Sequence, residues 1–261
     1  MNVYVRLTDE FNRGRIRAMI SSGQAVVLHK LAIMSKDGDW IVREDVEGTS
    51  HILGVLASYG ATYRFGAPLD VRCLAGGWSA HIEFREGPLR VRTDFVTRPP
   101  RLSAEALDGA WRDGERRSPP VLGIQALAEI KKTNREKDYV VIGELARRIP
   151  DVPGQFLYSR SARDLIGLAA AHPADWQRAV AQRPVLRLVP EGVEALEAAL
   201  DAERRQLMHA NERRLEAYRT AARDWAAAWP DVARAVAGMP LPDAHAAIVA
   251  RAERVLPFVV S

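Results

Sequence analysis

The chain has 261 residues, of which 48% are hydrophobic, and a formal net charge of +4. This length supports one large domain or two modest domains with hydrophobic cores. A single cysteine, Cys73, excludes an intramolecular disulfide and a zinc site built from several thiolates, and it is typical of a reducing compartment.

The sequence shows no sign of a membrane protein. No stretch approaches the roughly 18 apolar residues of a membrane span. The first residues lack a basic segment followed by an apolar run, so we expect no signal peptide. The sequence therefore predicts a cytoplasmic protein without a membrane partner, and its mild basic excess suits a partner that bears phosphate.

The first hundred residues mix helical and strand patterns. A helix signal runs over 9–31 with a break at 21–23, and a strand follows over 32–43. Residues 49–59 predict a helix, with Thr49 or Ser50 as its N-cap and Gly60 as its C-terminal stop. Three strands are expected near 62–74, 78–85 and 89–97, with a turn at 86–88 joining the last two.

Beyond residue 102 the pattern becomes helical, because prolines at 99 and 100 end the sheet region. Helices are predicted over 103–115, 123–133, 138–149 and 160–171, with a long helical pattern over 191–229 and a short final helix near 243–255. The sequence thus indicates a mixed helix and strand unit of about 100 residues, followed by a remainder of helices.

Three aspartates stand out in two strand-like segments. Asp37 and Asp39 are two residues apart, and strand side chains repeat with period two, so both would project from one face. Asp94 lies in the last predicted strand. If the three carboxylates converge, they form the ligand set that a divalent cation with phosphate ligands requires.

An alternative interpretation is structural. Asp37-Gly38 between apolar runs is a strong hairpin signal, and Asp94 would then be a solvent-facing strand residue beside Arg92. Three features favour the metal site. Gly23 opens a helix upstream and could cradle phosphate. The segments follow the order glycine and helix, carboxylate strand, helix, strands and carboxylate strand, and a basic cluster downstream could neutralise phosphate. The basic cluster consists of Lys131, Lys132 and Arg135.

The order of these features resembles the nucleotidyltransferase-fold superfamily, in particular the bacterial branch of AbiE-type toxins and minimal nucleotidyltransferases. The resemblance covers roughly residues 12–150. It rests on Gly23-Gln24, His29, the segment from Ser35 to Asp39, Asp94, and the helical segment 127–145. Two positions depart from the family pattern. Gln24 stands where the family has glycine or serine, and Gly38 stands where it has an apolar strand residue.

The resemblance implies an α+β fold. A nucleotidyltransferase-like mixed sheet with flanking helices would occupy residues 1–102, a helical extension of that core residues 103–154, and a C-terminal helical region residues 155–261. It also implies Mg²⁺ held by Asp37, Asp39 and Asp94. Nucleotide phosphates would be contacted by Ser22, Gly23, Lys131, Lys132 and Arg135.

The implied activity is transfer of a nucleoside monophosphate from a nucleoside triphosphate to an RNA end, a protein hydroxyl or a small molecule. Such an enzyme could be the toxin of a defence or toxin–antitoxin pair, with an antitoxin or a second copy bound through the C-terminal helices. Two alternatives stay open. One is a binding module with the same fold and a degenerate site, which Gln24 and Gly38 favour. The other is a basic RNA-binding protein without chemistry, for which arginines near Asp94 would form a rim (Arg85, Arg90, Arg92, Arg98 and Arg101).

Overall fold

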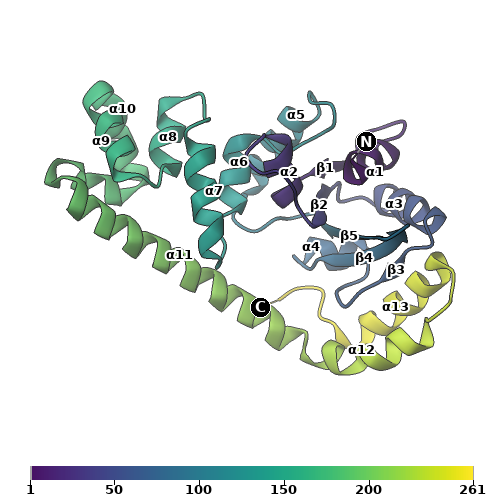
Figure 1. Cartoon of the computed structure of the whole chain (residues 1–261). Coiled ribbons are helices and arrows are strands. Elements are labelled where there is room, and N and C mark those ends of the chain that lie inside the picture. The colour runs from purple at the N-terminus through teal and green to yellow at the C-terminus, as the bar shows by residue number, and fades with distance from the viewer. Residues whose placement is uncertain (1, 261) are drawn as a thin grey trace. The chain divides into compact units, whose positions relative to one another are not determined.

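The structure is a computed structural model and describes residues 2–260. It is an α+β fold with one five-stranded mixed sheet and many helices (Figure 1). The strands are β1 (Ala18–Ile20), β2 (Asp37–Val42), β3 (Thr62–Tyr63), β4 (Ala80–Glu86) and β5 (Leu89–Val96). The helices are α1 (Val3–Phe11), α2 (Ser22–Leu28), α3 (Val46–Ser58), α4 (Val71–Ala75), α5 (Ala104–Gly114), α6 (Ile124–Ile130), α7 (Glu136–Ala146), α8 (Val152–Tyr158), α9 (Ala162–Ala171), α10 (Pro173–Gln182), the 3-10 helix η1 (Pro184–Glu191), α11 (Val193–Ala221), α12 (Arg223–Ala235) and α13 (Leu241–Val255).

The sheet has the strand order β1-β2-β5-β4-β3. β2 and β5 are parallel, whereas the other neighbouring pairs are antiparallel. Parallel strands need a long crossover, and residues 43–88, which include α3, β3, α4 and β4, provide it. This connection makes β2 and β5 neighbours although they are far apart in the sequence.

The chain divides into two compact units. One comprises the chain up to Leu122 together with the chain from Glu216 onward, and the other is Gly123–Leu215. These limits differ from the expected boundaries at 102/103 and 154/155. Residues 103–122 belong with the sheet, because Val121 forms a parallel bridge with Ile20 and Arg43 lies over the Trp111 ring at 4.2 Å.

The last helices also belong to the sheet unit rather than to a separate C-terminal region. Trp225 and Ile248 share a buried cluster with Cys73 and Trp78. The Trp225 indole donates a hydrogen bond to the Gly66 carbonyl at 2.9 Å, and burial of these large side chains accounts for the association. The other unit has its own core, formed by Phe156, Leu165, Leu186, Leu196 and their neighbours.

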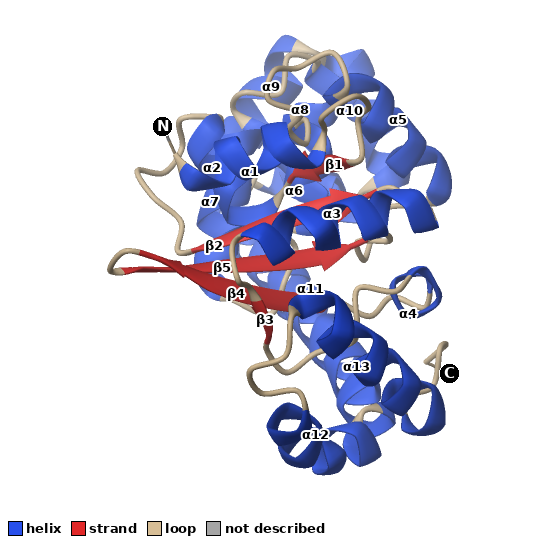
Figure 2. Cartoon of the chain, turned by 90° about the vertical axis from the view of Figure 1, so that its right-hand side faces the viewer, coloured by secondary structure: helices blue, strands red, loops and turns tan. Residues whose placement is uncertain are grey.

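An aromatic cluster covers one face of the sheet. Trp40 of β2 stacks on Phe95 of β5, with centroids 5.5 Å apart and planes 18° apart. Phe11 of α1 packs edge-on against both rings, and the Trp40 indole donates to Thr8 Oγ1 at 2.9 Å. Figure 2 shows α3 in front of the sheet, running nearly along β2 and β5. The opposite face carries the alternate, half-buried residues of β2 and β5.

Several of the predicted helices are confirmed, whereas other predicted helices and strands have different boundaries in the structure. The helices expected at 103–115 and 243–255 correspond to α5 and α13. The helix expected at 49–59 begins earlier, because Asp45 caps α3 by accepting from the Gly48 amide at 2.6 Å. The strand expected over 62–74 is only the two-residue β3, and Asp70 then caps α4. The single signal over 9–31 divides into α1, β1 and α2.

The hairpin interpretation of residues 36–39 is wrong, because Asp37, Gly38 and Asp39 all lie within β2. Gly38 is on the buried face of the strand. A Cβ atom there would lie 2.5 Å from ring atoms of both Trp40 and Tyr4. The glycine is therefore explained by the two aromatic rings that cover it, since an ordinary strand side chain has no space at this position.

Gly38→Ala is expected to lower the free energy of unfolding by about 1–3 kcal/mol, because the added methyl group overpacks the aromatic cluster. The matched control is Gly54→Ala in α3, where an added Cβ meets no atom of the described chain within 4 Å. That variant should be neutral or slightly stabilising, by up to about 1 kcal/mol. Urea unfolding measures both. Equal effects of the two substitutions would contradict the packing explanation.

Candidate functional site

The three aspartates lie on one face of two neighbouring strands. In the parallel register, Asp39 of β2 is opposite Asp94 of β5, and Asp37 is opposite Arg92. Register partners point to the same side of a sheet, and residues two apart on a strand do so as well. Asp37, Asp39 and Asp94 therefore project together from the half-buried face, on the side opposite Trp40 and Phe95.

Basic side chains of the same face partner two of these carboxylates. His81 Nδ1 lies 2.7 Å from Asp94 Oδ1, and Arg64 Nη2 also pairs with that oxygen. Asp37 Oδ1 lies 3.5 Å from Arg92 Nη1, yet it is buried and accepts no hydrogen bond from residues 2–260. Each of these two carboxylates thus has a positively charged neighbour within its own unit, as a group of acidic side chains on one surface requires.

The described chain holds no group of three His, Cys, Asp or Glu side chains close enough together to bind a metal ion as they stand. The pairings explain part of this finding, since Asp94 is turned to Arg64 and His81. A metal ion at Asp94 would have to replace these basic groups as its counter-charge.

Sequence reasoning missed Arg64 and His81 as neighbours of Asp94. His81 and Glu83 alternate along β4, and the antiparallel register places them opposite Asp94 and Arg92. Ser79 Oγ lies 3.0 Å from His81 Nε2. The alternation was visible in the sequence, but the order of the strands was not, so these neighbours could not be assigned.

The turn between β1 and α2 forms a backbone hydrogen bond with Asp39 of β2. The Ser21 amide donates to the Asp39 carbonyl at 2.8 Å, and Ser22 then adopts the left-handed conformation with φ of 47°. A Cβ atom on Gly23 would lie 2.3 Å from Ser35 Oγ. Because Gly23 has no side chain, the segment before β2 can lie against the start of α2. This contact leaves little open space at the Gly23 backbone.

Gln24 and His29, which belong to the expected phosphate-binding helix, make structural hydrogen bonds. Gln24 is 3% exposed, and its Nε2 donates to the Ser35 carbonyl at 3.0 Å. His29 Nε2 lies 2.8 Å from the Leu122 carbonyl. The bulk of Gln24 is thus directed into the protein, where it holds the segment between α2 and β2.

Lys131, Lys132 and Arg135 belong to the unit Gly123–Leu215, and each pairs with a carboxylate there. Lys131 is buried, and its Nζ donates to Asp138 Oδ1 at 3.2 Å. Arg135 Nε donates to Asp138 Oδ2 at 2.8 Å. Lys132 Nζ donates to Glu129 Oε2 at 2.7 Å and lies over the Tyr158 ring. The three positive charges thus offset acidic groups of their own unit.

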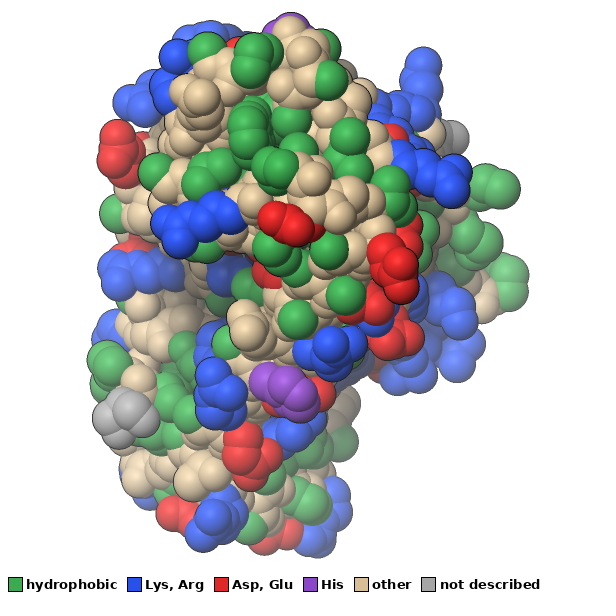
Figure 3. All heavy atoms as spheres, turned by 90° about the vertical axis from the view of Figure 1, so that its left-hand side faces the viewer, with side chains coloured by type: hydrophobic (Ala, Val, Ile, Leu, Met, Phe, Trp, Pro, Cys, Tyr) green, Lys and Arg blue, Asp and Glu red, His purple; other side chains and the backbone are tan. Residues whose placement is uncertain are grey.

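Three of the arginines that could form a basic rim near Asp94 are also paired with carboxylates, Arg92 among them through Asp37. Arg90 forms two hydrogen bonds with Glu83, and Arg98 pairs with Glu44. In the view of Figure 3, basic and acidic side chains are interspersed over the visible face. Cys73 is buried in α4, where burial raises the pKa of its thiol to about 12. A thiolate nucleophile is therefore disfavoured at neutral pH.

Comparisons of the chain with models of protein families, with curated proteins and with solved structures gave no match. No helix within residues 2–260 is both long and apolar enough to cross a membrane. The function is therefore inferred from the arrangement of the side chains.

Asp138→Asn is expected to destabilise the protein by about 3 kcal/mol near neutral pH, because it leaves the buried Lys131 ammonium unpaired. Burial acts to raise the pKa of Asp138, but the Thr133 hydrogen bond and the charges of Lys131 and Arg135 outweigh it and hold the pKa below 3.8. The carboxylate's contribution is therefore complete above the unfolded-chain pKa and is lost as the pH falls through the lower folded-state pKa.

The measurement is urea unfolding of both proteins at about pH 7 and about pH 3. The stability gap between wild type and Asp138→Asn should narrow at the lower pH, because pH 3 lies below the ordinary pKa of aspartate, about 3.9, so the unfolded wild-type chain is protonated at this carboxyl and the carboxylate contributes less to stability. A gap of the same size at both values would contradict the pairing. Glu136→Gln is a matched control, because the Glu136 side chain is 73% exposed.

Proposed function

We propose that this protein is a Mg²⁺-dependent nucleotidyltransferase that transfers a nucleoside monophosphate from a nucleoside triphosphate to a hydroxyl group. One observation carries the proposal. Asp37 and Asp39 share a face of β2, Asp94 lies opposite Asp39 on the parallel strand β5, and the β1–α2 turn is bonded to Asp39. The order of turn, helix, paired carboxylates and third carboxylate agrees with the nucleotidyltransferase-like pattern in the sequence.

The carboxylates fit magnesium in donor chemistry and share one face of two neighbouring strands, although no three of them within residues 2–260 are close enough to bind it as they stand. Mg²⁺ prefers carboxylate oxygens from one or two side chains together with substrate phosphates, which does not require a ready cage of three ligands. Asp37 Oδ1 is buried without a hydrogen bond from residues 2–260, and such an acceptor is better satisfied by a cation. When bound, Mg²⁺ would neutralise the triphosphate and lower the pKa of the attacking hydroxyl.

Within this proposal the basic side chains change partners when the substrate binds. Arg64 and Arg92, released from Asp94 and Asp37, would remain on the same face and could donate to phosphate oxygens. Ser22 and Gly23 would contribute backbone amides near the outer phosphates. Lys131, Lys132 and Arg135 receive no phosphate contact in the proposal, because their own carboxylates already hold them.

The proposed reaction needs only the nucleoside triphosphate and the acceptor hydroxyl. The acceptor oxygen attacks the α-phosphorus, the bond to the bridging oxygen of the β-phosphate breaks, and pyrophosphate leaves. Asp94 would take the proton of the acceptor hydroxyl. The acceptor is an RNA end, a protein hydroxyl or a small molecule. The likeness of the sequence to AbiE-type toxins suggests a role as a cytoplasmic defence effector, with an antitoxin as partner.

A second candidate function is a nucleotidyltransferase-like fold with a degenerate site that serves as a binding module. The pairing of Asp94 with Arg64 and His81 favours it, as does the close contact of Gly23 with Ser35. The two candidate functions predict different nucleotide binding. The enzyme requires nucleotide binding that depends on Mg²⁺, whereas the binding module does not.

Asp37→Ala and Asp94→Asn are each expected to lower Mg²⁺-dependent transfer by about a hundredfold or more, since even outer-shell partners of a metal contribute 10- to 100-fold. The assay incubates protein, each α-labelled nucleoside triphosphate, total RNA and Mg²⁺, and asks which molecule becomes labelled. Asp113→Asn is the control, because Asp113 is a half-exposed residue outside the site and pairs with Arg117. Unchanged transfer by either site variant would remove the assignment.

A further inference from the structure

A groove lies within the sheet unit, beside the ends from which the parallel strands β2 and β5 start (Figure 2). It is lined by residues of α1, of α2, of the loop before β2 and of the first part of β5, and its volume is about 570 Å³. Its apolar and aromatic lining residues are Val3, Tyr4, Val27, Ile33, Met34 and Leu89.

Three of these side chains form an exposed apolar rim around the groove. Ile33 is 97% exposed, Met34 is 73% exposed and Leu89 is 49% exposed. Single exposed apolar residues are ordinary on protein surfaces. Here, however, the three residues border a hollow that further apolar side chains line. A continuous apolar surface of this kind is typical of an interaction site.

The loop before β2 is held in place directly after Met34. Gln24 Nε2 of α2 donates a hydrogen bond to the Ser35 carbonyl at 3.0 Å, and the Tyr4 hydroxyl of α1 donates to the Lys36 carbonyl at 2.7 Å. Two helices therefore fix the backbone of this loop. Its exposed apolar side chains belong to a bonded segment, so their exposure is part of how the loop is built.

The charged side chains that line the groove are all basic. Among the described lining residues, Lys36, Arg90 and Arg92 are cations and none is a carboxylate. Arg90 is bonded to Glu83, and Arg92 Nη1 lies 3.5 Å from Asp37 Oδ1. Lys36 is exposed and forms no ion pair with residues 2–260. The apolar rim is therefore combined with positive charge, of which the Lys36 ammonium lacks a counter-charge in the chain.

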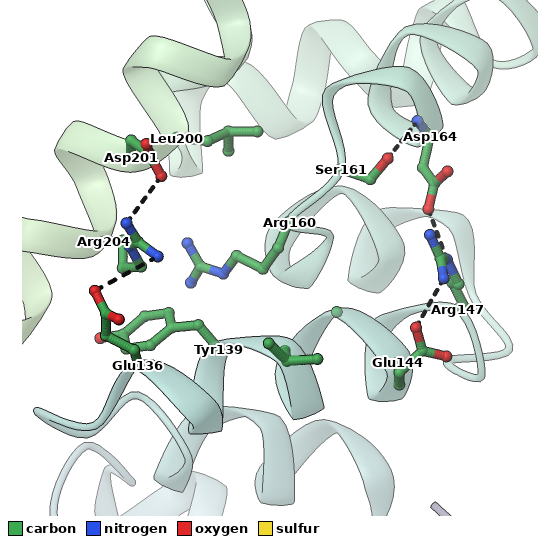
Figure 4. Close-up of a pocket in the computed structure, with 12 residues that line it drawn as sticks. Glu136, Tyr139, Glu144, Arg147, Arg160, Ser161, Asp164, Leu200, Asp201 and Arg204 are labelled. Atoms are coloured by element: carbon green, nitrogen blue, oxygen red, sulfur yellow. Dashed lines mark hydrogen bonds and ion pairs between the residues drawn. The ribbon is translucent and has the colours of Figure 1, made fainter.

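A pocket of the unit Gly123–Leu215, between α7, the start of α9 and α11, has a different charge balance. Four carboxylates and three guanidinium groups line it. Arg147 pairs with Glu144, and Arg204 pairs with Asp201 (Figure 4). The charges of that pocket are met by its own side chains, so they indicate no ligand. The groove beside β2 differs, because its lining offers cations without carboxylates.

We propose that this groove binds a segment of a partner protein in which apolar side chains are interspersed with aspartate and glutamate. The apolar side chains of the segment would fill the groove and cover Ile33 and Met34, and methionine adapts readily to a partner surface. Its carboxylates would supply the counter-charge of Lys36. The proposal does not require the transfer reaction, and the two share only Arg92.

Other occupants match the groove less well. A pocket buries most of a small-molecule ligand, whereas a small molecule in this groove would leave Ile33 in water. Single-stranded RNA stacks its bases on aromatic platforms, but the exposed rim is aliphatic. A bilayer would take up the exposed side chains of the rim but would not fill the concave surface between them. A protein segment covers both the hollow and its rim.

Selection of peptides from a displayed random library on the full chain tests the chemistry of the partner. The library peptides have about 16 residues, which corresponds to roughly four helical turns. The selected peptides should combine apolar residues with a net negative charge, and their binding should weaken as the NaCl concentration rises. Failure to select any peptide, or selection of basic or uncharged peptides, would overturn the proposal. Binding of phosphatidylglycerol vesicles or single-stranded RNA in place of an acidic peptide would do so as well.

Matched variants of the protein locate the binding surface, with fluorescence anisotropy of a labelled selected peptide as the measurement. Met34→Ser should weaken peptide binding by about tenfold or more, because it removes an apolar contact of the rim. Met239→Ser is the control, since Met239 is 43% exposed and lies outside the groove, and it should leave binding within about twofold.

A second pair of variants tests the charge independently. Lys36→Glu should weaken peptide binding by about fivefold or more, whereas Lys137→Glu, at an exposed position of α7, should leave it within about twofold. Circular dichroism verifies that each variant is folded, and the charge pair decides the outcome if Met34→Ser does not fold. Equal effects of a groove variant and its control would show that the peptide binds elsewhere and would overturn the proposal.

Discussion

The parallel pairing of β2 with β5 determines where the acidic side chains of the candidate site lie. On the buried face, the stacking of Trp40 on Phe95 and the edge contacts of Phe11 favour one register. A shift of one residue would bring the rings to the opposite face, so the aromatic cluster also fixes Asp39 opposite Asp94. Gly38 makes this possible, because it leaves space for the Trp40 ring against the strand.

On the half-buried face of the sheet, basic side chains pair with two of the three aspartates in the absence of a ligand. Asp94 is paired with Arg64 and His81, and Asp37 has Arg92 as its neighbour. A surface of acidic groups alone would disfavour folding through mutual repulsion. Under the proposed function, the same basic groups that stabilise the metal-free protein would bind phosphate oxygens once a metal ion replaced them. The proposal therefore reconciles stability without a metal with binding of a nucleotide.

Short-range patterns predicted the strand character of the aspartate segments and most of the helices, because these depend on periodicity along the chain. Asp37 and Asp39 on one strand face followed from the period of two. Strand order could not be predicted, so Arg64 and His81 were missed as neighbours of Asp94. The interpretation of Gly38 as a turn residue failed for a similar reason, since the rings that exclude a side chain there include Tyr4, which is distant in the sequence.

Long-range burial also changed the limits of the units and the interpretation of the basic residues. The expected C-terminal region is split, because Trp225 and its neighbours pack on the sheet unit, whereas residues 155–215 form a core with the preceding helices. Lys131 looked like a phosphate ligand in the sequence, yet it is buried against Asp138, seven residues further along. Charge alone does not distinguish a ligand-binding lysine from one that neutralises a buried carboxylate.

The most direct test of the central claim is calorimetric titration of the wild-type protein with a non-hydrolysable nucleoside triphosphate, with and without Mg²⁺. If Asp37, Asp39 and Asp94 hold the metal together with the triphosphate, binding heat should be present with Mg²⁺ and largely lost when the metal is removed with a chelator. Binding that is identical in the two conditions, or absent from both, would contradict the account.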